Sequence, residues 1–233
     1  MGCPVADFIF DLNDDGTVRT AYKDGTPMTT TMRLELPTAI VHTYFKSAVR
    51  NLRQMTDDEV DHEANRLHGL QCFLMSLVGV EAFINVFFHQ AGIERSLTEV
   101  INLANKDKTT IEHKLSHLPR QTYGSNLPAQ KRLNKKMREL YDLRSKIVHP
   151  KWEPSSLAMP GLSIVGMVEN EQQMFENRDL CREALCWCLL VIARIGMLAR
   201  GSQADDHFVW YWTSLSETNA SLSAALNVPP DGA

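Results

Sequence analysis

Residues 140–150 have the sequence LYDLRSKIVHP and end a strongly charged segment with helical periodicity. Arg144 continues the i, i+4, i+7 spacing of an apolar stripe, and side chains at that spacing share one face of a helix. The apolar members of this stripe are Leu133, Met137 and Leu140. The pattern therefore predicts a core-facing helix on which the Arg144 guanidinium points where apolar groups point.

Residues 77–88, LVGVEAFINVFF, show the opposite charge in the same kind of setting. Glu81 lies inside this apolar run, and Asn85 follows it one helical turn later. An inward carboxylate and an inward guanidinium are each costly to bury unless they are paired. We therefore expect Glu81 and Arg144 to meet. The pair is either a purely structural ion pair or a device that holds a catalytic arginine in place.

His149 lies five residues beyond Arg144, which is about 140° further round an ideal helix. Ser145 and His149, at i and i+4, share a face of that helix. Pro150 disfavours helical geometry at His149, so we expect this ring to lie where the helix ends. The alternative is a helix-terminal histidine that interacts only with the last carbonyl groups.

The segment 131–151 is basic within a chain whose formal net charge is −4. Its acidic residues are Glu139 and Asp142, and its basic residues are Lys131, Arg132, Lys135, Lys136, Arg138, Arg144, Lys146 and Lys151. Such a segment attracts phosphates locally or forms a solvated helix face, and both readings stay open on charge alone.

The rest of the 233-residue chain fits one mainly helical domain with a small appendage. Residues 1–37 contain strand-like stretches separated by the turn signals NDDG and KDGTP, which predict a β-hairpin or meander. Residues 38–219 have helical periodicity, including a helix over 57–90 and another that we expect to stop at Pro119. Residues 220–233 resemble a loose tail.

Composition argues against several classes of site. Hydrophobic residues make up 44% of the chain and charged residues 22%, which is ordinary for a soluble protein. Five cysteines in mostly apolar helical contexts predict reduced thiols, and the start of the chain lacks the pattern of a signal peptide. Neither apolar run, around 70–91 or 184–199, is a convincing membrane span. We therefore expect a cytoplasmic protein that does not act at a membrane.

No metal or cofactor site is predicted. Asp11, Asn13, Asp15 and Gly16 imitate the start of a calcium loop, but Tyr22 occupies the position that requires a bidentate glutamate. His113 and His117 are four residues apart, as are His68 and Cys72, yet no third ligand is placed by spacing. We expect these residues to be solvated or packed side chains.

The stretch LRSKIVHP resembles the Arg-x(4–6)-His signature of HEPN domains, a helical superfamily that includes many metal-independent ribonucleases. LVGVEAFINVFF resembles the preceding family helix, in which an acidic residue lies in an apolar run. The resemblance covers roughly residues 38–200. The family often has Asn, Asp or His directly after the arginine, where this chain has Ser145. A second Arg-x(6)-His spacing, Arg200 and His207, lacks the apolar stripe.

The resemblance implies a HEPN-like helical bundle that acts as a metal-independent endoribonuclease in a defence or toxin system, to which the strand pattern of residues 1–37 adds an N-terminal β-hairpin. It implies a homodimer with the motif at the interface, RNA as substrate and an antitoxin or defence protein as a further partner. His149 would act as general acid or base, Arg144 would stabilise phosphoryl charge, Ser145 would orient the substrate and Glu81 would position Arg144. The expected contacts to the RNA backbone are Lys135, Lys136, Arg138 and Lys146.

Two alternatives remain. A non-catalytic HEPN-like module would use the same helices for dimerisation or to bind a nucleotide, RNA or protein. A helical scaffold would use Glu81 and Arg144 only as a structural pair.

Overall fold

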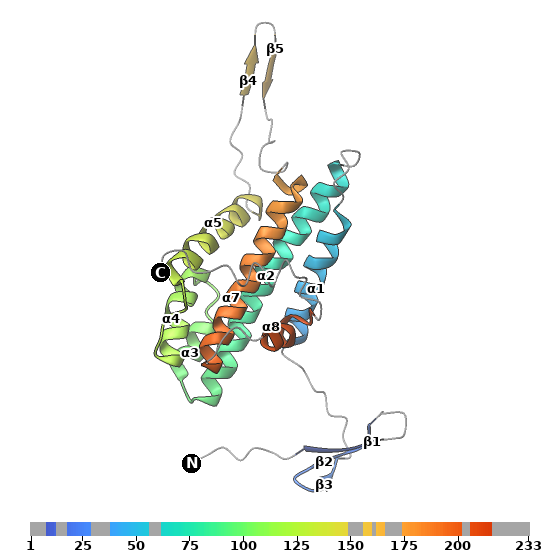
Figure 1. Ribbon diagram of the computed structural model, residues 1–233, viewed down its shortest axis with the longest axis vertical. Coiled ribbons are helices and arrows are strands. Elements are labelled where there is room, and N and C mark those ends of the chain that lie inside the picture. The colour runs from blue at the N-terminus through green and yellow to red at the C-terminus, as the bar shows by residue number, and fades with distance from the viewer. Residues whose placement is uncertain are drawn as a thin grey trace. The chain divides into compact units, whose positions relative to one another are not determined.

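The computed structural model describes residues 8–12, 18–28, 38–55, 62–148, 156–159, 162–165, 174–201 and 206–215. The chain divides into two compact units, Met1–Leu36 and Pro37–Ala233. The first unit contains a small antiparallel sheet of three strands, and the second contains seven α-helices among the residues described (Figure 1). The predicted fold class, mainly helical with a small N-terminal sheet, is confirmed.

The N-terminal sheet consists of β1 (Phe8–Leu12), β2 (Val18–Lys23) and β3 (Thr26–Pro27). β1 pairs antiparallel with β2, with Phe8 opposite Lys23 and a register shift between Asp11 and Leu12. Asp24 and Gly25 both have positive φ and form the tight turn into β3. The stretch MTTTMRLEL, for which we expected strand structure, lies outside the described residues apart from Met28.

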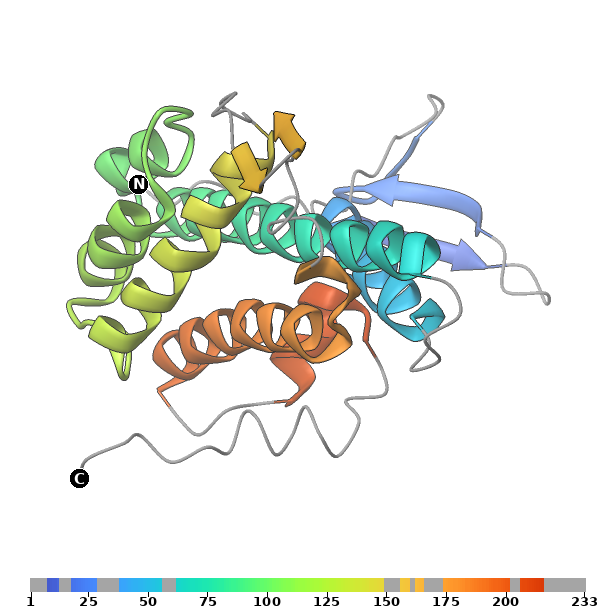
Figure 2. The ribbon, with the colours of Figure 1, turned by 90° about the horizontal axis from the view of Figure 1, so that it is seen from above.

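The helical unit is centred on two long helices, α2 (His62–Glu94) and α7 (Arg178–Arg200), which lie side by side in Figures 1 and 2. Helix α1 (Thr38–Gln54) packs on α2 and also contacts α8 (Asp206–Thr213). On the other side, α3 (Thr98–Ala104) and α4 (Ile111–Tyr123) follow the end of α2. Helix α5 (Gln130–Val148) packs on α4 and reaches α7 and α2.

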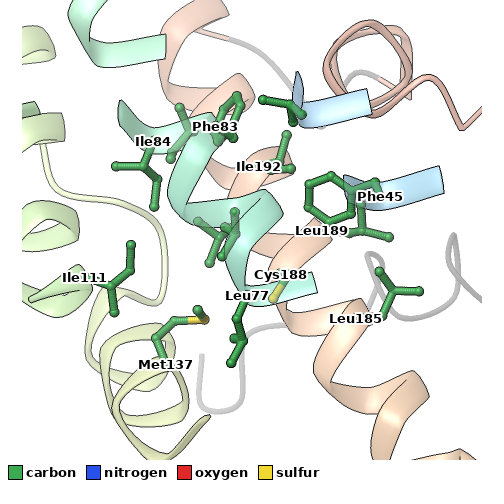
Figure 3. Close-up of a cluster of buried hydrophobic side chains, with 14 of the residues drawn as sticks. Phe45, Leu77, Phe83, Ile84, Ile111, Met137, Leu185, Cys188, Leu189 and Ile192 are labelled. Atoms are coloured by element: carbon green, nitrogen blue, oxygen red, sulfur yellow. The ribbon is translucent and has the colours of Figure 1, made fainter. Parts of the chain in front are cut away.

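The core fills the space between these helices. Figure 3 shows apolar side chains of α1, α2, α4, α5 and α7 meeting in one cluster, and α2 supplies Leu77, Phe83 and Ile84 to it. By length and hydropathy alone α2 is a candidate membrane span, but half of its most apolar stretch is buried inside the protein.

Helix α4 corrects the prediction of a stop at Pro119, because the helix continues to Tyr123. Proline removes the N–H that would bond the carbonyl group four residues earlier, which is that of Leu115. Here Gln130 donates its side-chain Nε2 to the Leu115 oxygen at 3.0 Å. The helix ends instead at Gly124, whose φ of 74° is left-handed.

A second hairpin, β4 (Ser156–Met159) and β5 (Leu162–Val165), lies between α5 and α7 in the sequence. A short 3-10 helix, η1 (Met174–Glu176), precedes α7. It is attached to the start of α2, because Glu176 accepts hydrogen bonds from Arg66 and lies 3.0 Å from the His62 ring. The predicted tail, residues 220–233, lies outside the described residues.

Candidate functional site

The candidate site is built on the last turns of α5. The apolar stripe predicted for this helix is confirmed, because Leu133, Met137 and Leu140 are buried. Arg144, the next member of the stripe, is partly buried. Its guanidinium carbon lies 5.6 Å from the centre of the Tyr141 ring, within the range of a cation–π interaction.

Tyr141 connects the predicted arginine to the predicted glutamate. Its hydroxyl donates to the Leu77 carbonyl oxygen on α2 at 3.0 Å and lies 3.5 Å from Glu81 Oε2. The direct ion pair that we expected between Glu81 and Arg144 is absent among the described residues. Tyr141 precedes Arg144 by three residues on the same side of α5, so its ring contacts the guanidinium while its hydroxyl reaches α2.

The environment keeps the Tyr141 hydroxyl protonated. Burial raises the pKa of Tyr141 well above its usual value, and the nearby Glu81 carboxylate raises it further, while Arg144 acts in the opposite direction. A protonated hydroxyl can donate to the α2 carbonyl throughout the neutral range.

Lys114 is a second cation near Glu81 and was missed in the sequence analysis. Its side chain on α4 is only 3% exposed. The ammonium donates to Asn85 Oδ1 at 2.7 Å and to the Ala104 carbonyl oxygen at 2.8 Å. Burial lowers the pKa of Lys114, and Glu81 opposes that change. The polar residues within the apolar run of α2 therefore interact with α4 as well as with α5.

A signal for Lys114 was present in the sequence. It lies on the apolar stripe formed by Ile111, Leu115 and Leu118, as Arg144 lies on the stripe of α5. The reasoning that places Arg144 facing the core on α5 therefore also predicts that Lys114 faces the core on α4.

Among the basic residues expected to contact RNA, Lys136 and Arg138 are held by carboxylates. Lys136 lies 2.9 Å from a carboxylate oxygen of Glu183 on α7. Arg138 donates two hydrogen bonds to Glu112 on α4, one of them at 2.8 Å, and these hydrogen bonds lower the pKa of the glutamate. Glu183 and Glu112 come from other helices, so the local sequence of α5 does not reveal them, whereas Glu139, 3.8 Å from Lys136, lies on α5 itself.

The remaining candidates on α5 face solvent. Lys135, Ser145 and Lys146 are exposed. Lys146 and Lys136 also line an open groove of about 310 Å³ between α5 and α7, with Leu140 and Leu180 among its apolar lining. His149 and Pro150 lie outside the described residues, so the geometry of the Arg144–His149 pair stays a prediction.

The other candidate ligands have ordinary environments. His113 and His117 stack with their ring centres 4.0 Å apart on the exposed side of α4. His68 lies 3.0 Å from Asn51 Oδ1, and burial raises the pKa of Cys72 to about 12. In the part of the chain that the structure describes, no three metal-binding side chains cluster. Asp11 and Tyr22 lie on paired antiparallel strands, while residues 13–17 are outside the description.

No protein-family model, curated protein or solved structure matches this chain.

Proposed function

We propose that this protein is a metal-independent endoribonuclease of HEPN type, with Arg144 as the group that binds the phosphate at the cleavage site. The observation that carries the proposal is the set of contacts made by the Arg144 guanidinium. It is partly buried and oriented on an aromatic ring, and its described contacts include no carboxylate. Lys136 and Arg138, by contrast, are neutralised by glutamates. Because no carboxylate occupies this guanidinium, it is available to bind a phosphate.

The proposed chemistry uses the 2′-hydroxyl of RNA as nucleophile. A base removes its proton, the 2′ oxygen attacks the adjacent phosphorus, and the bond to the 5′ oxygen breaks, leaving a 2′,3′-cyclic phosphate and a 5′-hydroxyl. His149 would serve as the acid or base, because histidine titrates near neutrality. Arg144 would stabilise the charge that develops on the phosphoryl oxygens. Ser145, exposed beside Arg144, would orient the substrate.

The proposed setting is a homodimer in the cytoplasm, in which the motifs of two copies face one RNA, as part of a toxin or defence system with an antitoxin or other protein partner. Lys135 and Lys146 are exposed candidates for contacts to the RNA backbone. Lys136 and Arg138 would first have to leave their glutamates, which weakens their contribution.

The test is RNA cleavage by the purified full-length protein in the presence of a metal chelator. We expect Arg144→Ala to lower the cleavage rate by about 10²–10³-fold, as expected for a lost group that stabilises transition-state charge. His149→Ala should lower it by about 10²–10⁴-fold. Arg182→Ala, which removes an exposed arginine of α7 paired with Asp179, is the matched control and should cleave as well as wild type. Wild-type protein that leaves RNA intact would contradict the proposal.

A non-catalytic RNA-binding or dimerisation module is the second candidate. It is favoured by the ion pairs of Lys136 and Arg138, which resemble structural links between helices. This candidate predicts RNA that is bound but not cleaved, with affinity that falls steeply as salt is raised. A purely structural role for Arg144 predicts instead that Arg144→Ala lowers only the melting temperature.

A further inference from the structure

The contacts of Tyr141 go beyond what a packed aromatic residue requires. One end of the side chain is fixed on α2, where the hydroxyl donates to the Leu77 carbonyl oxygen and lies beside Glu81. The Arg144 guanidinium, on the next turn of α5, lies over the face of the ring. The side chain therefore links the backbone of one helix to the charged group proposed to bind phosphate.

The surroundings restrict where this ring can move. Leu77, whose carbonyl oxygen accepts the hydroxyl, is itself fully buried, so this acceptor belongs to the rigid core. Met137, one turn before Tyr141 on α5, is also fully buried. A ring packed against this core offers a nearly fixed surface, and a guanidinium that rests on it loses little further freedom when it binds an anion.

Glu81 acts on the position of Arg144 only through the Tyr141 side chain. Because no direct ion pair with Arg144 is formed, the carboxylate does not compete with a phosphate for the guanidinium. Its other neighbours are on the α4 side, where Lys114 holds Asn85 one turn further along α2. The carboxylate can thus fix the position of Arg144 without neutralising it.

We propose that Tyr141 is a positioning residue, whose ring, fixed by its hydroxyl to α2, holds the Arg144 guanidinium in the orientation in which it receives an RNA phosphate. This inference rests on the proposed ribonuclease function for its catalytic consequence. The orientation of Arg144 itself can be tested without any activity.

The chain offers a matched control for the ring. Tyr123 on α4 carries the guanidinium of Arg95, 4.7 Å from the ring centre, in a comparable cation–π pair that does not involve α5. Tyr141→Leu and Tyr123→Leu therefore remove the same kind of contact at two different places. Tyr141→Phe keeps the ring that carries Arg144 and removes only the hydroxyl.

The first measurement is the rate at which phenylglyoxal modifies Arg144, followed by mass spectrometry of the peptide in wild-type and variant full-length proteins. We expect Tyr141→Leu to raise the rate several-fold, because the guanidinium leaves its ring, and Tyr123→Leu to leave it unchanged. The modification rate of Arg138 in the same digests reports whether a variant has unfolded. An Arg144 rate that is the same in wild type and Tyr141→Leu, with Arg138 also unchanged, would overturn the proposal.

The second measurement separates kcat from KM for cleavage of a short single-stranded RNA. We expect Tyr141→Leu to lower kcat at least 10-fold with a KM within about threefold of wild type, since the lost orientation matters most in the transition state. Tyr141→Phe, which keeps the ring and removes its bond to α2, should have a kcat between those of Tyr141→Leu and wild type, and Tyr123→Leu should have the wild-type kcat. Equal kcat values for Tyr141→Leu and Tyr123→Leu would refute the positioning role. If wild type cleaves no RNA, the ribonuclease proposal fails, and the phenylglyoxal rates alone decide whether Tyr141 positions Arg144.

Discussion

At the scale of single residues, Lys114 is the most unusual feature of the core. It is 3% exposed, and its two described acceptors, Asn85 Oδ1 and the Ala104 oxygen, are both uncharged. Burial lowers the pKa of Lys114, so the unfolded chain binds this proton more tightly than the folded protein does. The free energy of unfolding should therefore rise with pH between the lowered folded pKa and the unfolded value near 10.5.

Lys114→Met tests this dependence because methionine fills a similar volume without titrating. The stability of wild type minus that of the variant should increase from pH 7 to pH 10, by at most about 1.4 kcal/mol per pH unit. Urea unfolding at each pH measures it, and taking the difference removes the titrations that the two proteins share. The variant Lys135→Met, which alters an exposed lysine, should show no such trend. A flat difference for Lys114→Met would show that this lysine stays charged in the folded protein.

The part of the site that could be predicted from sequence is the inward position of Arg144, because a charge in an apolar stripe is visible in a single helix. The way in which that charge is accommodated could not be predicted. Tyr141 lies in the motif segment, residues 140–150, yet only the packing of α5 on α2 shows that its hydroxyl donates to the Leu77 carbonyl oxygen. The pairing of Arg138 with Glu112 likewise joins helices whose contact no local pattern specifies.

At the scale of elements, the contact between α2 and η1 depends on a glycine. A Cβ atom on Gly69 would lie 1.9 Å from the Phe175 backbone oxygen and 3.1 Å from the Cys181 sulfur. Glu176, which follows Phe175, is tied to α2 by Arg66, so η1 cannot easily withdraw. We expect Gly69→Ala to destabilise the protein by about 2–4 kcal/mol, because this overpacking exceeds the roughly 1 kcal/mol that alanine gains in a helix.

Gly79→Ala is the matched control on the same helix. The three atoms nearest to its Cβ atom would all belong to the Phe45 ring, at 3.0–3.2 Å, and a ring can shift by a few tenths of an ångström. The gain in helix propensity should offset this cost, leaving the free energy of unfolding within about 1 kcal/mol of wild type. Urea unfolding of both variants compares them directly. Equal stability of Gly69→Ala and Gly79→Ala would mean that η1 is displaced at little cost.

The helices were more predictable than their ends. Apolar periodicity is local, whereas in the continuation of α4 past Pro119 the freed Leu115 carbonyl oxygen accepts from Gln130, a residue outside that helix. The three residues of η1 likewise show no periodic pattern of their own, and their position is set by contacts with α2. Element type therefore follows from the sequence more reliably than element boundaries, which tertiary contacts override.

At the scale of the whole molecule, the two compact units differ in what stabilises them. In the part of the chain that the structure describes, the buried apolar side chains run from Val41 to Trp212 and so belong to the helical unit. A sheet of three short strands needs a hydrophobic face or a packed helix to be stable on its own. We therefore expect the helical unit to fold independently of the sheet.

A chain of residues 37–233 tests this independence. Its circular dichroism should show a higher helical content per residue than the full chain, because the removed unit contributes strands. Its thermal unfolding should stay a single cooperative transition, since the core that sets cooperativity is retained. The melting temperature should fall by no more than a few degrees. A broad, non-cooperative transition would show that the helical unit needs residues 1–36 in order to fold.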